Sequence, residues 1–195
     1  MRVRTLGAAV AAVIALAGLA GCRTNVGTAA TVDGHRITES DVNDYITPDA
    51  SVSLQTSSGN FSEAPRSFVI RELIDDRLFR KLLSKTPGGE PTNAQLDASL
   101  GHDLAGKTPK QFAESIGLRG FTADFDQLFF RVEELNKALS NAQQSGANVN
   151  ALVKALRFPV SISARYGHWD RKKFSLVGTP AAPSYLSVQP SAAAH

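Results

Sequence analysis

The chain has very little cysteine, and its charges are almost balanced. Among its 195 residues there is one cysteine, and 21 lysine and arginine residues stand against 18 aspartate and glutamate residues, a net charge of +3. One cysteine excludes an internal disulfide framework, and the four histidines share no ligand spacing such as i,i+4, so we expect no metal site. The small net charge excludes the concentrated basic face of a nucleic-acid-binding protein. The length predicts a single domain.

The first 22 residues are organised like an export signal. Arg2 and Arg4 form a short positive region, and Leu6 to Ala20 contains no charged side chain. This apolar run is shorter than the roughly 20 residues needed to span a bilayer, and its length is typical of the apolar region of a signal peptide. It ends in Leu19-Ala20-Gly21-Cys22. An ordinary secretory signal and a buried alanine-rich helix with a chance cysteine are the alternatives.

The sequence Leu19-Ala20-Gly21-Cys22 resembles the lipobox of bacterial lipoproteins. The resemblance implies that the Cys22 sulfur receives a diacylglycerol, that a peptidase removes residues 1–21 as a lipoprotein signal peptide, and that the new amino terminus can be acylated. Two or more acyl chains hold a protein stably on a membrane. We therefore expect a protein on the extracytoplasmic face of the cell membrane, anchored through lipid on Cys22. Residues 1–21 contain two arginines and no acid, so their removal lowers the net charge to +1.

The remaining chain divides into three predicted parts. Residues 22–28 are a lipidated tether, and because six residues reach only about 20 Å when extended, the folded body must lie close to the membrane. Residues 29–176 are the folded domain. Residues 177–195, rich in alanine, proline and serine, are predicted to be a disordered tail.

Capping sequences and apolar spacing predict most of the domain as α-helix. Thr38, Thr92 and Thr108 are each followed three residues later by a side chain that can complete a capping box. Apolar side chains recur at three- and four-residue steps in a helix from Ser62 to Leu83 and in the longest helix, which begins at Thr122 and ends near Ser145. The helix that Thr38 opens is predicted to continue through Tyr45 and Ile46 until Pro48 stops it.

Strands are predicted only near the two ends of the domain. Residues 29–37 contain Asp33-Gly34, a turn signal between β-prone segments. Residues 160–165 alternate between apolar and polar side chains, as a half-buried strand does. Residues 48–62 are rich in serine, threonine and glycine and are predicted to be a loop. The fold class is therefore mainly α, with one two- to three-stranded sheet that pairs the N-terminal and C-terminal strands.

This order of elements carries a second resemblance. Residues 30–42 (ATVDGHRITESDV) are similar to the opening of the N-terminal domain of SurA-type periplasmic chaperones and parvulin-type foldases. Residues 163–170 (SARYGHWD) are similar to the N-P-R-Y-G-x-W-D close of lipoprotein relatives, with Ser163 and Ala164 in place of Asn and Pro. The resemblance implies a SurA N-terminal-like helical domain. Only 25 residues follow Asp170, too few for the family's isomerase domain of roughly a hundred residues, so we expect no isomerase.

No pattern of residues in the chain predicts catalysis. The sequence contains neither a glycine-rich phosphate loop after a strand nor a G-x-S-x-G nucleophile elbow. The adjacent acids Asp75-Asp76 and Glu133-Glu134 point about 100° apart on predicted helices and are interpreted as solvated helix faces. We therefore expect a non-catalytic protein with no cofactor and no metal.

Three aromatic residues are candidate peptide-binding residues: Phe130, Tyr166 and Trp169. Phe129 and Phe130 are adjacent and cannot both face one side of a helix, so one of them is expected to be partly exposed. Tyr166 and Trp169 are read either as packing anchors for the closing strand or as amphipathic contacts for an extended peptide. An exposed apolar patch would be a binding surface.

The sequence supports two functions from different classes. The first is a membrane-anchored extracytoplasmic lipoprotein with a chaperone-like module that binds unfolded or extended exported polypeptides. The alternative is an envelope lipoprotein that recognises one specific folded partner or assists the assembly of a cell-envelope complex. The partners expected are the membrane, through Cys22, and unfolded exported proteins, but no nucleic acid.

Overall fold

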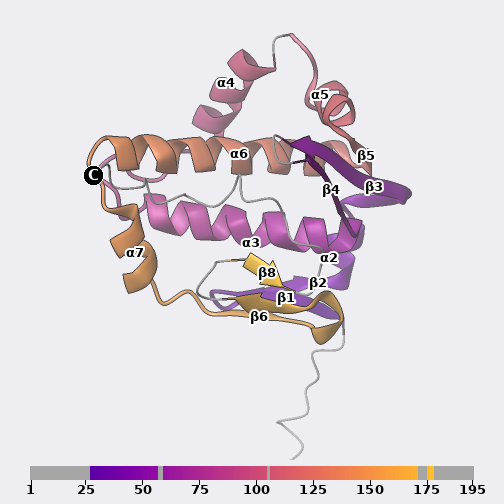
Figure 1. The fold of residues 1–195 in the computed structure, drawn as a ribbon, viewed down its shortest axis with the longest axis horizontal. Helices are drawn as coiled ribbons and strands as arrows, with labels where there is room; N and C mark the ends of the chain where they lie inside the picture. Colours follow the sequence, from indigo (N-terminus) through magenta and orange to yellow (C-terminus); the bar gives the residue numbers. More distant parts are fainter. Residues whose placement is uncertain (1–26, 57–58, 105, 171–174, 178–195) are drawn as a thin grey trace, which may run out of the picture.

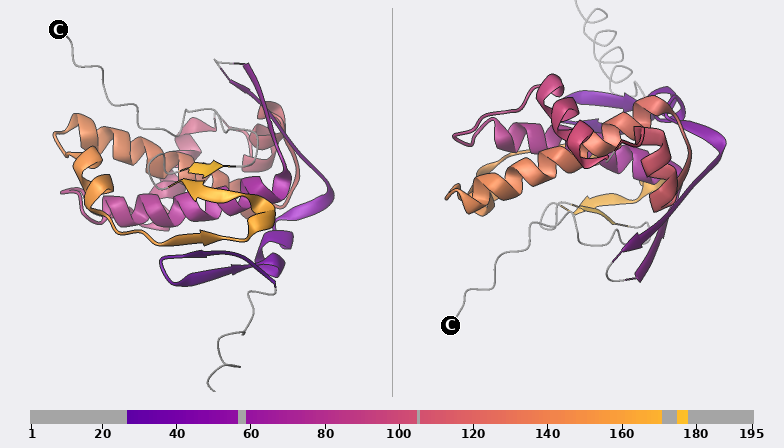
Figure 2. Two further views of the ribbon diagram at one scale, coloured as in Figure 1. Left: turned by 60° about the horizontal axis from the view of Figure 1, so that its bottom comes forward. Right: turned by 90° about the horizontal axis from the view of Figure 1, so that it is seen from above.

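Two long helices, α3 (Pro65–Leu83) and α6 (Ala123–Gln144), lie side by side at the centre of the molecule (Figure 1). The computed structural model describes residues 27–56, 59–104, 106–170 and 175–177. The helices α4 (Asn93–Asp103) and α5 (Pro109–Ile116) pack on α6. A small sheet packs on α3 from the opposite side, and α7 (Val149–Ala155) connects α6 to this sheet, as Figures 1 and 2 show.

The sheet beside α3 joins the two ends of the domain. Its strand order is β2 (His35–Thr38), β1 (Thr28–Val32), β6 (Val160–Ile162), and both pairings are antiparallel. Val32 pairs with His35 on one side and with Val160 on the other. Asp33 and Gly34 make the tight turn between β1 and β2 with positive φ angles of 49° and 82°. The predicted pairing of the N-terminal and C-terminal strands is thus confirmed.

A second sheet corrects the predicted fold class. The segment expected to be a loop, residues 48–62, lies almost entirely in β3 (Ile46–Thr56) and β4 (Gly59–Glu63), and β5 (Leu118–Phe121) pairs with the other side of β3. Exposed serines, Ser51, Ser53 and Ser62, hid the alternation. Val52, Leu54 and Phe61 are buried on one face, and this period of two is the pattern of a half-buried strand. Composition alone was a poor guide here.

The expectation of a mainly α domain with one small sheet is therefore wrong. In the described part of the chain there are three antiparallel sheets with eight strands, about a quarter of the structure, beside six α-helices. The third sheet pairs β7 (His168–Asp170) with β8 (Ser175–Val177). The alternating side chains of β3 and β4 bury too much apolar surface for these residues to remain a loop.

Helix ends follow the predicted capping residues closely. Thr38, Thr92 and Thr108 each complete a capping box, at α2 (Glu39–Asn43), α4 and α5, and Thr122 caps α6. Two predicted helix boundaries are wrong because the residues in question belong to strands. The first helix ends at Asn43, before Ile46 enters β3, and α3 begins at Pro65 because residues 59–63 pair with β3.

A cluster of phenylalanine rings fills the space between the start of α3, the start of α6 and β5. The ring of Phe125 lies 4.5 Å from that of Phe121 and 5.7 Å from that of Phe68, and the ring of Phe129 lies 5.8 Å from Phe68. Such ring pairs add to the free energy gained from burial of their surface. This cluster fixes the position of the two long helices at one end.

Gly117 allows α5 to turn directly into β5. Its φ is +99°, and a Cβ at this position would lie 1.9 Å from the backbone oxygen of Ser53 on β3. Only glycine tolerates both this backbone conformation and this close approach. The junction therefore brings β5 onto β3.

The predicted signal peptide, Cys22 and nearly all of the tether and tail lie outside the described residues. The body begins close to its predicted boundary, since β1 starts at Thr28, and Val177, predicted as the first tail residue, is the last residue of β8. None of the helices in the described ranges is both long and apolar enough to cross a membrane.

Candidate functional site

Phe130, the first candidate peptide-binding residue, is in the core. It lies on α6 with 5% of its surface exposed, and its ring centroid is 5.4 Å from that of Phe112 on α5 and 5.1 Å from that of Phe129. Both adjacent phenylalanines are buried, so the expectation that one is partly exposed is wrong. The reason is tertiary: α5 covers the side of α6 that points away from α3.

Tyr166, the second candidate, holds the closing segment on α2. It belongs to the 3₁₀ turn η1 (Ala164–Tyr166), is 7% exposed, and its hydroxyl donates a 2.6 Å hydrogen bond to Oε2 of Glu39. Arg66 and Arg165 contact the same carboxylate at 3.4 and 3.0 Å. Burial and the bond to Glu39 raise the pKa of the Tyr166 hydroxyl. These contacts are those of a packing anchor.

Trp169, the third candidate, is half-buried on β7, where it pairs with Leu176 of β8 and packs against the core. The structure does not bring the three candidates together into one site. Phe130 faces α5, whereas Tyr166 faces α2, on the other side of the two central helices. Their role in peptide binding remains a prediction, and of the three only Trp169 is not fully buried.

A cleft opens instead where β2, α2, α3 and the first turn of α6 meet. Its volume is about 410 Å³. Its lining combines two arginines, three aspartates and a partly apolar floor: Arg36, Arg77, Asp41, Asp44, Asp124, Ile37, Tyr45 and Leu73. Asp44 and Asp124 are exposed, whereas Ile37 is buried. A surface of this kind can bind a partner that carries both polar and apolar groups.

Tyr45 lines this cleft and is held through both its ring and its backbone. Its ring packs edge-on against Phe125 at 5.9 Å, and its backbone oxygen accepts a 3.1 Å hydrogen bond from the amide of Thr122, the cap of α6. Burial raises the pKa of its hydroxyl, and the carboxylates of Asp124, Asp41, Asp76 and Asp44 raise it further. Burial and the neighbouring carboxylates therefore both keep the Tyr45 hydroxyl in its neutral form.

Little in the sequence indicates this cleft. Asp41 is predicted only to complete the capping box of Thr38. The other lining residues come from the turn after α2 and from β2, α3 and α6, spread between residues 36 and 124. The available signal was the acidic run Asp41-Val42-Asn43-Asp44, which no motif distinguishes from a solvated turn.

Charged side chains are also buried between α3, β4 and α6. Arg71 is 4% exposed, and its Nη2 lies 3.1 Å from Oε2 of Glu63 and 3.5 Å from Oε1 of Glu72. Asp75 on α3 and Glu133 on α6 are close enough to interact electrostatically with these charges. We call Glu63, Arg71, Glu72, Asp75 and Glu133 the buried charge cluster.

The prediction that both acid pairs lie on solvated helix faces is therefore wrong for Asp75 and Glu134, which are buried. Asp76 and Glu133 are only partly exposed, and the side chain of Asp76, 21% exposed, pairs with Arg80 at 2.9 Å. Within the described ranges, no group of three or more histidine, cysteine, aspartate or glutamate residues is placed to hold a metal ion.

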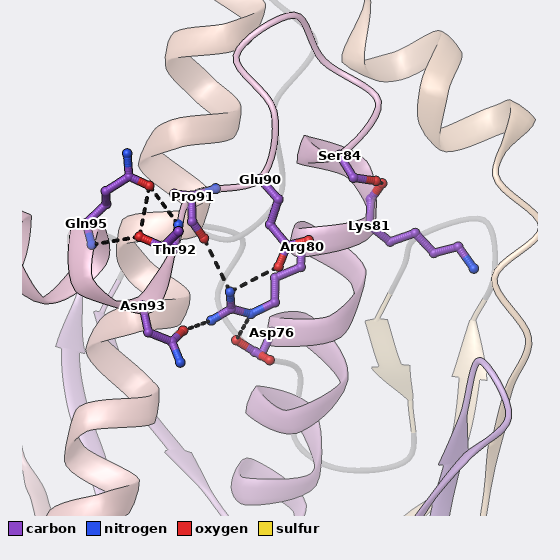
Figure 3. A network of polar contacts seen from close by, with 9 residues as sticks. All are labelled: Asp76, Arg80, Lys81, Ser84, Glu90, Pro91, Thr92, Asn93 and Gln95. Carbon is purple, nitrogen blue, oxygen red and sulfur yellow. Dashed lines mark hydrogen bonds and ion pairs between the residues drawn. The ribbon is translucent and has the colours of Figure 1, made fainter.

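Arg80 organises a polar network of another kind, at the surface between α3 and α4 (Figure 3). Its guanidinium reaches Asp76 at 2.9 Å, Glu90 at 3.2 Å and the side-chain oxygen of Asn93 at 2.7 Å. Lys81, the next residue, points away and pairs with Asp33 in the β1–β2 turn. The contacts of Arg80 hold the connection between α3 and α4 in place, and the contact of Lys81 holds the β1–β2 turn on α3. Both roles are structural.

Comparisons of the chain with protein-family models, with curated proteins and with solved structures gave no match. The resemblance to SurA-type chaperones therefore stays a prediction from the residues that carry it. The two features of the described structure that invite a functional interpretation are the cleft around Tyr45 and the buried charge cluster.

Proposed function

We propose that the chain is a lipid-anchored extracytoplasmic lipoprotein whose domain acts as a binding module, not as an enzyme, and recognises a specific folded partner through the cleft around Tyr45. The observation that carries this proposal is the cleft itself, whose mainly polar lining places charges of both signs beside the apolar side chains of Ile37 and Leu73. The lipobox-like sequence at Cys22 supports the anchored location.

Burial of the aromatic candidates favours this function over general capture of unfolded chains. Binding of many unfolded segments needs exposed apolar area, and Phe130 and Tyr166 lie in the core. The chaperone-like function remains a prediction of the sequence, and suppression of client aggregation by the full chain tests it. A charged cleft instead favours selectivity, since a partner with mismatched charges is rejected.

The arrangement of the cleft supports one docking orientation. Asp41 and Asp44 lie on and just after α2, and Asp124 lies in the first turn of α6, while Arg77 comes from α3. The capping of α2 and the Thr122–Tyr45 hydrogen bond fix α2, the turn after it and the start of α6 to one another, so the three aspartates are preorganised. Preorganisation reduces the entropy lost on binding.

Site-specific photocrosslinking in membranes tests the binding function. A photoreactive residue in place of Asp44 should yield one predominant crosslinked species, and Asp124→Lys in the same chain should reduce its yield at least about tenfold, the effect of 1.4 kcal/mol. The matched control places the photoreactive residue at Asn141, exposed at the other end of α6. Equal products from both positions contradict the proposal, and a broad ladder of products from Asp44 supports the chaperone-like alternative.

Lipid labelling tests the anchor separately. Cells expressing the chain and fed an alkyne fatty acid should incorporate the label, and Cys22→Ser should abolish incorporation, because the thiol that receives the diacylglycerol is lost. Cys22 is the only cysteine of the chain, so fatty-acid label retained by the Cys22→Ser variant, or no label on the wild type, would contradict the lipoprotein assignment without bearing on the cleft.

A further inference from the structure

The buried charge cluster contains one cation and four acids. Glu63 comes from β4, Arg71, Glu72 and Asp75 from α3, and Glu133 from α6. Glu63, Arg71, Glu72 and Asp75 are all at most 5% exposed. Arg71 is within 3.5 Å of two of the carboxylates, Glu63 and Glu72, and its guanidinium also lies 4.8 Å from the ring centre of Phe68. One guanidinium cannot balance the three buried carboxylates of Glu63, Glu72 and Asp75 together with the half-buried Glu133.

Glu72 is the most isolated of these acids. It is 0% exposed, and neither of its carboxylate oxygens has a hydrogen-bond partner in the described part of the protein. Its close charge partner there is Arg71, which makes a shorter contact with Glu63. A buried carboxylate without hydrogen bonds costs several kcal/mol in its ionised form, so such a group takes up a proton instead.

We propose that the folded domain retains at least one proton on the buried charge cluster at neutral pH, and that loss of this proton at higher pH loosens the packing of α3 on α6. The proton converts Glu72 or a neighbour into a neutral acid that needs no second cation. This property of the fold is independent of the lipid anchor and of the cleft.

The electrostatics of every element around the cluster agree with this proposal. Burial raises the pKa of Glu72 well above its usual value and that of Asp75 to about 7, while Arg71 opposes both shifts. Burial also raises the pKa of Glu133, opposed by Arg71 and by Lys137. Lys137 is largely exposed and pairs with Glu134 at 2.7 Å, and β4 contributes the acid Glu63. Arg71 is thus the one cation among the five residues of the cluster.

The direction of the pH effect follows from proton linkage. Glu72, Asp75 and Glu133 each bind a proton more tightly in the folded chain than in the unfolded chain, because their pKa values are raised on folding. The stability that they contribute is therefore complete below about pH 4, where both states are protonated, and is lost as the pH rises toward and through 7.

Urea unfolding of the full chain in detergent, at pH 5, 6, 7 and 8, tests the proposal. Between pH 5 and pH 8 the unfolding equilibrium constant should increase in both proteins. The factor of increase should be at least about ten times larger for the wild type than for Glu72→Gln, because glutamine is a neutral isostere that needs no proton. The amides of α3, corrected for the intrinsic exchange rate, should lose protection by a similar factor in the wild type only.

Asp126→Asn is the matched control. Asp126 is a buried acid on α6 outside the cluster, and burial raises its pKa to about 6. In Asp126→Asn, the pH dependence of unfolding that comes from Asp126 should disappear. The pH dependence that Glu72→Gln removes should remain. Equal slopes in wild type and Glu72→Gln would overturn the proposal.

A direct measurement covers the case in which Glu72→Gln fails to fold. Infrared difference spectra of the wild type between pH 5 and pH 9, with carboxyl carbons of glutamate and aspartate isotopically labelled, should show the carbonyl stretch of a protonated acid that persists at pH 7. A wild type with no protonated carboxyl group at pH 7 would also overturn the proposal.

Discussion

The same two helices make two very different contacts along their length. At their first turns, α3 and α6 meet through the rings of Phe68, Phe125 and Phe129, which are buried and lie 5.7 and 5.8 Å apart across the interface. One and two turns further along, the interface contains Glu72 and Glu133. Arg71 lies between the two regions and touches both, since it contacts the ring of Phe68 and the carboxylate of Glu63.

This contrast separates contacts that stabilise from contacts that respond to conditions. Apolar rings gain free energy on burial regardless of pH. Buried acids gain little on folding, and their effect depends on whether they hold protons. One interface can thus be stable at one end and sensitive to pH further along.

The largest effect is expected at the aromatic end. Phe125→Ala removes a fully buried ring that contacts Tyr45, Phe68 and Phe121, and it should lower the free energy of unfolding by about 3–5 kcal/mol at every pH. Urea unfolding measures it. Phe112→Ala, at a half-buried ring on α5, is the control and should cost less than half as much. If the loss of unfolding free energy in Phe125→Ala varied strongly with pH, the distinction between a pH-independent aromatic end and a pH-sensitive charged region would be contradicted.

Removal of the arginine between the two regions should cost slightly less and depend on pH. Arg71→Met keeps most of the side-chain volume but leaves Glu63 and Glu72 without their cation, which typically costs about 3 kcal/mol. The loss should be greater at pH 8 than at pH 5, because protonated acids do not need the cation. Urea unfolding at the two pH values measures this difference. Arg71→Lys, which retains the charge, should recover part of the stability. A loss that is larger at pH 5 would show that packing against Phe68 dominates.

The smallest effect is expected for an exposed ion pair on the outer side of α6. Arg131 makes two 2.7 Å hydrogen bonds to Asp97 of α4, and both side chains are partly exposed. Arg131→Gln should cost less than about 1 kcal/mol and the loss should shrink with added salt. A double-mutant cycle with Asp97→Asn isolates the pair. If the coupling free energy between Arg131 and Asp97 were as large as that between Arg71 and Glu63, exposed and buried ion pairs in this protein would not differ in strength.

Local signals in the sequence predicted much of the fold. The threonines at positions 38, 92, 108 and 122 mark helix starts because their hydroxyls accept hydrogen bonds from amides three residues later, and this chemistry is complete within one turn. The Asp33-Gly34 turn and the period-two pattern after Pro159 likewise predicted the joined terminal strands. These features depend on neighbours in the sequence.

Features that depend on distant partners were missed. Residues 48–62 pair chiefly with one another in β3 and β4, but the pairing of β3 with Leu118 and Arg119 of β5, far along the chain, left no local signal. The burial of Phe130 depends on α5, and the cleft gathers residues from four elements. No spacing within one segment records such contacts.

The single cysteine, the near-neutral charge and the caps of the helices were settled by the sequence itself, because each depends on residue identity or on contacts within a few residues. Only the tertiary structure decided which acids are buried. Asp75 and Asp76 are adjacent and chemically the same, yet one is buried beside Arg71 and the other pairs with Arg80 at the surface. The physical reason is that the environment of a charge, and hence its protonation, is set by the elements that pack around it.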